Sequence, residues 1–139
     1  MQGLPEVVDY LETRKDIARD RLGFFGISGG AQLGVVGLAL EPRIRAAVLV
    51  LIGLHPGKPP ETSELNFAPR VRMPVLMLNG REDFLLSVET QQLPLLRLLG
   101  TPDKDKRNVL YASGHESPIQ QYVKETLDWF DRYLGPVNK

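Results

Sequence analysis

The sequence predicts an α/β fold, in which about four parallel strands are flanked by helices in a three-layer sandwich. Short apolar runs alternate along the 139 residues with segments whose apolar residues recur at helical spacing. The run IRAAVLVLI (residues 44–52) is almost continuously apolar, which is typical of a strand covered on both faces of a parallel sheet. Alternating strands and helices predict right-handed crossovers between parallel strands. The length predicts a single domain over residues 1–139.

The first elements follow from periodicity and from turn residues. A helix is predicted over residues 4–18, because apolar residues recur there at helical spacing and Pro5 suits a first turn. The apolar run 22–27 predicts a strand, and residues 31–40 predict a helix rich in small side chains. The second strand is the apolar run described above.

The middle of the chain is richer in glycine and proline. Residues 53–72 are predicted to form a loop, and residues 74–78 (PVLML) a third strand. Ser87 can cap a helix that extends to about residue 99, which Pro94 kinks or interrupts. Each strand is thus followed by a loop or a helix, as the fold class requires.

The end of the chain predicts one more strand and a closing helix. Residues 108–111 read as the fourth strand, and residues 118–134 as a helix that Gly135 ends. One apolar face is predicted on this helix, formed by Ile119, Tyr122, Val123, Thr126, Leu127, Phe130 and Leu134.

The composition excludes several classes of partner. The formal net charge is zero, with 42% hydrophobic and 24% charged residues. Nucleic acid and anionic membranes attract a basic surface, so neither is expected as a partner. The chain has no cysteine, which excludes disulfides and thiolate chemistry. We find no signal peptide and no apolar run long enough for a bilayer, so a soluble cytoplasmic protein is expected.

Three side chains with catalytic chemistry follow three different strands. Ser28 follows the first strand in GISGG, Asp83 the third strand in GRED, and His115 the fourth strand in SGH. Sites in parallel sheets form beyond the carboxyl ends of the strands, so these side chains are expected to converge. The alternatives are a loop role for Ser28, a helix cap for His115, and Glu82 in place of Asp83.

The three residue types have complementary roles in nucleophilic catalysis. A hydroxyl needs a base within hydrogen-bond reach, and His115 can accept the proton of Ser28. An acid behind the imidazole fixes its tautomer and stabilises the imidazolium. The flanking glycines are expected to permit a strained turn, where side chains would collide with backbone. The backbone N–H of Gly29, in the surroundings of Gln32 and Ala31, is expected to bind the oxyanion.

These motifs resemble the carboxyl-terminal half of an α/β hydrolase. The chain order Ser, Asp, His is that of the family, and PVLMLNGREDF and ETLDWFDRYLGPV resemble bacterial serine esterases and hydrolase domains related to prolyl oligopeptidase. The resemblance covers nearly the whole chain. It implies Ser28 as nucleophile, Asp83 as acid and His115 as base.

The sequence also departs from the family. The full fold has eight strands, of which this chain supplies four, and the loop that carries the second oxyanion donor has no counterpart here. The strand before Ser28 would become an exposed apolar edge, which invites pairing with another chain. We therefore expect a homodimer or higher homo-oligomer that covers this edge.

The expected function is hydrolysis of small, short-acyl esters through an acyl-serine intermediate. Few residues separate the second and third strands, so no substantial cap domain is expected over the site. The alternatives are a peptidase or amidase of the prolyl-oligopeptidase type and a non-catalytic assembly module with a relic triad. No cofactor is implied, and two histidines without an acid cluster do not suggest a metal site.

His55 and the three apolar residues after the acid are candidates for contact with substrate. His55 follows the second strand and either borders the pocket or belongs to a loop. Phe84, Leu85 and Leu86, directly after the acid, either line an acyl pocket or pack under their own loop.

Overall fold

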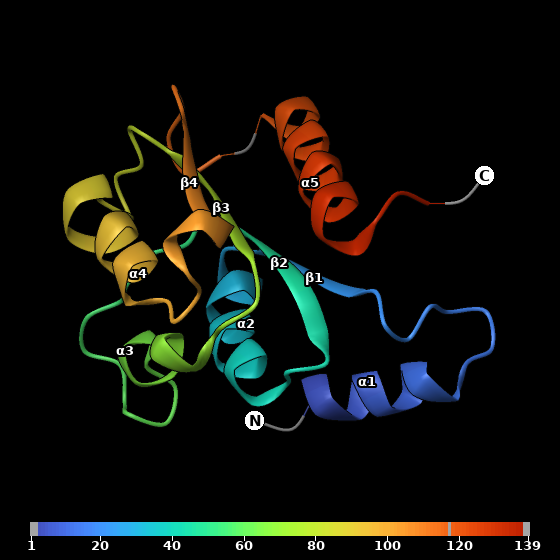
Figure 1. Ribbon diagram of the computed structural model, residues 1–139. Helices are drawn as coiled ribbons and strands as arrows, with labels where there is room; N and C mark the ends of the chain where they lie inside the picture. The colour runs from blue at the N-terminus through green and yellow to red at the C-terminus, as the bar shows by residue number, and fades with distance from the viewer. Residues whose placement is uncertain (1–2, 117, 138–139) are drawn as a thin grey trace.

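A single four-stranded parallel sheet forms the centre of the protein. The computed structural model describes residues 3–116 and 118–137. The strands lie in the order β1-β2-β3-β4 and are all parallel (Figure 1). Their bounds are Leu22–Ile27 for β1, Ile44–Val50 for β2, Val75–Gly80 for β3 and Lys106–Tyr111 for β4. Because neighbours in the sheet are also neighbours in the sequence, every crossover joins adjacent strands.

Helices cover the sheet on both faces and complete the predicted three layers (Figure 1). One face packs against α2 (Gly29–Leu40) and α4 (Leu93–Leu98), with the short α3 (Glu64–Phe67) beside α2. The other face packs against α5 (Ile119–Leu134). The α/β fold class is therefore confirmed.

Burial along the strands follows their position in the sheet. Every residue of β3 and all but Arg45 of β2 are buried, whereas β1 and β4 are partly exposed. The continuous apolar run thus forms a central strand, as predicted. It ends two residues early, at Val50, because Leu51 has a φ of 56° and leaves the extended conformation.

The first helix is shorter than predicted. Helix α1 spans Leu4–Thr13 and does not continue to residue 18. Arg14 is extended, and its guanidinium binds Asp16 through Nε–Oδ1 and Nη2–Oδ2 contacts of 2.8 and 2.6 Å. Apolar spacing did not reveal this local charge pairing, which belongs to a turn rather than to a helix.

Two predictions for the middle of the chain are corrected in detail. The predicted loop 53–72 contains α3, for which Ser63 Oγ accepts a hydrogen bond from Leu65 N, and a 3₁₀ turn (Ala68–Arg70). The helix predicted over residues 87–99 is divided into a π-type turn (Val88–Gln92) and α4. Ser87 caps the first part as predicted, and Pro94 lies in the first turn of α4, where its missing N–H costs nothing.

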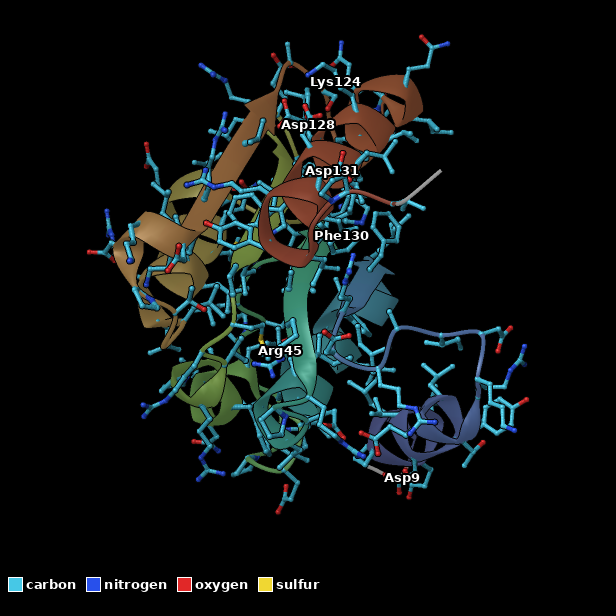
Figure 2. All side chains as sticks on the ribbon, turned by 45° about the vertical axis from the view of Figure 1, so that its right-hand side comes forward. Asp9, Arg45, Lys124, Asp128, Phe130 and Asp131 are labelled. Atoms are coloured by element: carbon cyan, nitrogen blue, oxygen red, sulfur yellow. The ribbon has the colours of Figure 1, made fainter. Side chains whose placement is uncertain are left out.

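The apolar face predicted on α5 is only partly buried. Tyr122 and Trp129 pack onto the sheet, but Ile119, Val123 and Leu127 are exposed. Figure 2 shows the charged Lys124 and Asp128 on α5, where they form an exposed ion pair of 2.8 Å. The exposed apolar residues of α5 lie beside β1, at an open edge of the sheet. No helix in the described residues is both long and apolar enough to cross a lipid bilayer.

Candidate active site

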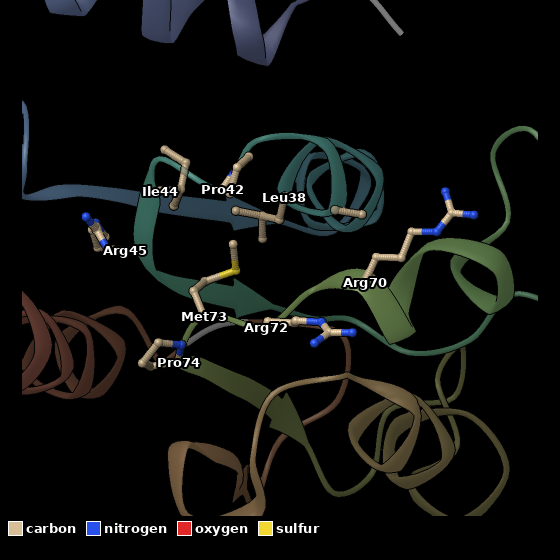
Figure 3. A pocket seen from close by; sticks show the side chains of 9 residues that line it. Leu38, Pro42, Ile44, Arg45, Arg70, Arg72, Met73 and Pro74 are labelled. Atoms are coloured by element: carbon tan, nitrogen blue, oxygen red, sulfur yellow. The ribbon is translucent and has the colours of Figure 1, made fainter.

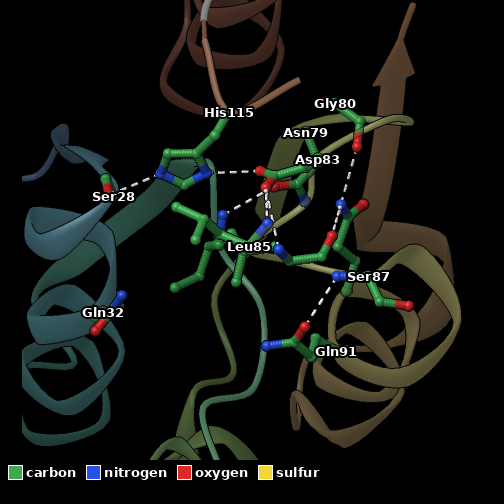
Figure 4. Close-up of polar contacts among 12 residues, drawn as sticks. Ser28, Gln32, Asn79, Gly80, Asp83, Leu85, Ser87, Gln91 and His115 are labelled. Atoms are coloured by element: carbon green, nitrogen blue, oxygen red, sulfur yellow. Dashed lines mark hydrogen bonds and ion pairs between the residues drawn. The ribbon is translucent and has the colours of Figure 1, made fainter. Parts of the chain in front are cut away.

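Ser28, Asp83 and His115 meet at the carboxyl edge of the sheet. Ser28 Oγ lies 3.2 Å from His115 Nε2, and His115 Nδ1 lies 2.6 Å from Asp83 Oδ2 (Figure 4). Each side chain follows a different strand (β1, β3 and β4). The structure therefore brings together the three side chains that the sequence selects.

Ser28 occupies a strained turn between β1 and α2. Its φ of 50° and ψ of −113° lie outside the regions that a serine ordinarily adopts, at a cost of about 1–3 kcal/mol. Two backbone hydrogen bonds maintain this conformation: Ser28 N donates to Val50 O at 2.8 Å, and Ser28 O accepts from Gln32 N at 3.0 Å. Such a turn exposes the hydroxyl of a nucleophile above the sheet.

The glycines around Ser28 are not equally constrained. A Cβ on Gly26 would lie 2.9 Å from Gly30 O and 3.0 Å from Ala31 N, so no side chain fits there. A Cβ on Gly29 or Gly30 would meet nothing within 4 Å, so the collisions expected at all flanking glycines occur only at Gly26. Gly29 opens α2, where the first backbone N–H groups have no acceptor within the helix.

The loop after β3 fixes the carboxylate of Asp83. Its side chain is fully buried, and Oδ1 accepts hydrogen bonds from Leu85 N at 2.8 Å and Leu86 N at 3.0 Å. These bonds leave Oδ2 for the imidazole of His115. Glu82 is exposed and contributes only its backbone N–H, which donates to Ser113 O. Asp83, rather than Glu82, contacts the histidine.

The loops that carry the acid and the histidine cross in direct contact. Arg81 N donates to Tyr111 O at 2.8 Å. A Cβ on Gly80 would overlap the carbonyl oxygens of Ser113 and Gly114, so only glycine permits this crossing. The separation of Asp83 and His115 is thereby set by backbone contacts.

A network of buried amides below the Asp83 loop was not predicted. Asn79 Oδ1 accepts from Ile52 N, and its Nδ2 donates to Asn108 Oδ1, both at 2.8 Å. Gln92 Nε2 donates to Gly80 O and Leu86 O at 3.0 and 2.8 Å. Asparagine within the apolar run PVLMLNG was the available signal, because a buried amide must find partners.

The remaining candidate residues do not all behave as expected. Phe84 and Leu85 are 84% and 54% exposed, so they do not pack under their loop, whereas Leu86 is buried in the core beneath it. His55 and Gln32 bind each other through their side chains, with Nε2 atoms 2.9 Å apart. Gln32 is therefore engaged elsewhere and does not contribute its side chain to the oxyanion site.

Tyr111, which ends β4, does not offer a second base near the site. Burial, together with nearby Glu125, raises the pKa of Tyr111 to about 12, so its phenol stays protonated at neutral pH. Within residues 3–116 and 118–137, no three acidic or histidine side chains are grouped as metal ligands.

A hollow of about 370 Å³ lies at the opposite, amino-terminal end of the strands (Figure 3). Arg45, Arg70 and Arg72 contribute to its lining, around Met73 and Leu38. Figure 3 shows these guanidinium groups spread apart rather than directed at one point. This hollow is not part of the arrangement around Ser28.

Comparison with known proteins places this geometry in a wider context. No model of a known protein family matches the chain. A Mycobacterium tuberculosis protein, provisionally named a phosphoribosyl transferase and recorded in two strains, is 28% identical over 138 residues. The match covers 96% of this chain but only 29% of that protein. The chain thus spans less than a third of the curated relatives it matches.

Solved structures show the fold directly. A cold-adapted esterase from an Arctic intertidal metagenomic library is 26% identical with a TM-score of 0.77, over 94% of this chain and 56% of the esterase. The α/β hydrolase GrgF from Penicillium sp. sh18 is 12% identical with a TM-score of 0.79, over 96% of this chain and 71% of GrgF. An acylaminoacyl peptidase from Pyrococcus horikoshii is 16% identical with a TM-score of 0.72, over 96% of this chain and 27% of the peptidase.

These structures cover almost all of the present chain, whereas the chain covers only a part of each of them. The chain therefore has an α/β fold that matches part of the α/β-hydrolase fold of these structures.

Proposed function

We propose that the protein is a serine hydrolase that cleaves small carboxylic esters through an acyl-serine intermediate. The observation that carries this proposal is the continuous chain of contacts from Ser28 Oγ through His115 to Asp83, at 3.2 and 2.6 Å. A histidine between a hydroxyl and a buried carboxylate is the arrangement that activates a serine. The esterases and the peptidase among the similar structures agree with a hydrolase.

In the proposed reaction, His115 Nε2 takes the proton of Ser28 as Oγ attacks the ester carbonyl. The resulting oxyanion accepts a hydrogen bond from the backbone N–H of Gly29. His115 then protonates the departing alkoxide, and an acyl-serine and an alcohol result. Water attacks the acyl group with His115 again as base, which releases the acid and restores Ser28. Asp83 orients the imidazole and stabilises its cation.

The surroundings of Ser28 favour short acyl groups. The connection between β2 and β3 contains only the four-residue α3 and a 3₁₀ turn, which is too little to form a cap. Phe84 and Leu85 are exposed beside the acid instead of enclosing a channel. A long acyl chain would therefore gain little burial, and burial is what favours long substrates.

The proposal is tested with p-nitrophenyl esters and a serine-directed fluorophosphonate on the wild-type chain. We expect hydrolysis of the acetate and butyrate with kcat/KM at least tenfold higher than for the decanoate, and one phosphonate group per chain. Faster cleavage of a peptide p-nitroanilide would favour a peptidase instead. Absence of both hydrolysis and labelling would support a non-catalytic module.

We also propose that a second copy of the chain covers the free edge of β1. Phe25 and Ile27 on this strand are each 46% exposed and line a hollow of about 500 Å³ with residues of α5. A two-fold axis beside β1 would pair the two edge strands and bring the two apolar surfaces together. Such a dimer satisfies the unpaired backbone groups of both edges.

This assembly predicts a concentration-dependent dimer of twice the 15.5 kDa chain mass in light scattering. Phe25→Lys should shift the protein to a monomer, because two lysines would meet across the axis. Leu33→Lys is the matched control, since Leu33 is a similarly exposed apolar residue on α2. A monomeric wild type at high concentration would contradict the proposed dimer.

A further inference from the structure

Four polar side chains form a closed ring one helical turn from Ser28. Gln32 Nε2 contacts His55 Nε2 at 2.9 Å, and His55 Nδ1 lies 3.3 Å from Glu64 Oε1, within ion-pair distance but without the geometry of a hydrogen bond. Lys58 Nζ closes the ring by donating to Glu64 Oε1 at 2.5 Å and to Gln32 Oε1 at 2.9 Å. Its members come from α2, from the loop after β2 and from the first position of α3.

The ring joins the buried charge of Glu64 to α2, the helix that follows Ser28. The side chain of Glu64 is 1% exposed, and Lys58 supplies the opposite charge. Only Gln32 belongs to α2, where its backbone N–H donates to Ser28 O. Through this one residue, the loop after β2 is tied to the turn that holds the nucleophile.

The donors and acceptors of the ring determine which atom faces which. An ammonium group only donates, so the atom of Gln32 that faces Lys58 must be the carbonyl oxygen. The amide nitrogen then faces His55 and donates to Nε2, which must be unprotonated. The imidazole proton is therefore on Nδ1, the nitrogen that faces Glu64. The ring thus specifies one tautomer of His55.

We infer that this ring, defined as Gln32, His55, Lys58 and Glu64, is a positioning network for Ser28. This positioning role rests on the proposed function. Ser28 holds an unfavourable backbone conformation, and the ring restrains Gln32, whose backbone N–H donates to Ser28 O. A looser turn would lengthen the Ser28–His115 contact in part of the population, and small displacements of reacting groups lower rates strongly. The four residues act through the position of Ser28 and do not themselves react.

Gln32→Met is the most selective change, because it removes the link to α2 while Lys58 and His55 still surround Glu64. We expect kcat for p-nitrophenyl acetate and the rate of phosphonate labelling to fall about tenfold, with KM changed less than twofold. Gln121→Met, an exposed glutamine on α5, is the matched control and should leave both rates unchanged. Lys58→Met, with Lys124→Met as its control, should have a similar effect on kcat if it folds.

The tautomer of His55 gives a readout that does not depend on catalysis. The chain has two histidines, so ¹⁵N NMR at pH 8 can resolve each imidazole. We expect the Nδ1–H form of His55 in the wild type and a mixture of tautomers in Gln32→Met. The Nε2–H form of His55 in the wild type would contradict the proposed hydrogen bond from Gln32 to His55 and so overturn the proposed network.

The two readouts separate the possible failures. A folded Gln32→Met with altered tautomers but wild-type kcat and labelling would show a merely structural ring and overturn the positioning role. A wild type with the Nδ1–H tautomer that neither labels nor hydrolyses esters would overturn the proposed function and, with it, the positioning role. In that case the connection between the loop and α2 would still stand as a structural result.

Discussion

Ser28→Ala should lower kcat for p-nitrophenyl acetate by about 10⁴-fold or more, because residual catalysis without a triad nucleophile comes only from binding and oxyanion contacts. Ser28 Oγ is the hydroxyl that lies 3.2 Å from the imidazole. The same variant should lose fluorophosphonate labelling completely. Burst and steady-state release of p-nitrophenol, followed at pH 8, measure the effect on kcat.

The loss should not arise from unfolding. Among the described residues, the Ser28 hydroxyl forms a hydrogen bond only with His115, and alanine keeps the Cβ that the strained turn already accommodates. The thermal midpoint should therefore change little. Ser113→Ala is a stringent control, because this buried hydroxyl lies two residues from His115 and has no hydrogen-bond partner among residues 3–116 and 118–137. Activity that survives in Ser28→Ala but not in Ser113→Ala would identify a different nucleophile.

The sheet could be predicted because buried strands appear in the sequence as short, continuous apolar runs. Residues 44–50 are apolar almost without interruption, since helices cover both faces of a central parallel strand. The parallel arrangement followed from the alternation of strands and helices, and the carboxyl ends of parallel strands necessarily share one edge. That rule placed Ser28, Asp83 and His115 at one edge without any knowledge of the structure.

Other features could not be predicted because they depend on contacts between distant segments. The apolar face of α5 was expected to be buried, but helical periodicity does not reveal whether enough sheet lies beneath the helix. The end of α1 is a local feature instead: Arg14 is extended after Thr13 and its guanidinium binds Asp16, which apolar spacing does not register. The ring that includes Gln32 and Glu64 joins residues 32 positions apart, and each of them alone reads as an ordinary polar residue.

Asp83→Asn should lower kcat by about 10³–10⁴-fold, because an amide cannot satisfy both sets of partners of this carboxylate. In the wild type, Oδ1 accepts from Leu85 N and Leu86 N while Oδ2 accepts from His115 Nδ1. An asparagine that keeps its oxygen toward the loop presents an N–H to Nδ1 and forces the wrong tautomer. The reverse orientation presents an N–H to two backbone donors and destabilises the loop.

The two orientations have distinguishable consequences for Asp83→Asn. If the oxygen stays on the loop, the thermal midpoint is retained and ¹⁵N NMR shows the Nε2–H tautomer of His115, which cannot accept the proton of Ser28. If the amide reverses, the midpoint falls as well. Glu82→Gln is the matched control: Glu82 is exposed and, within the described residues, bonds through its backbone alone, so kcat should stay within twofold. A large loss in Glu82→Gln together with a small one in Asp83→Asn would reassign the acid to Glu82, because the carboxylate that orients the imidazole is the one whose charge the reaction requires.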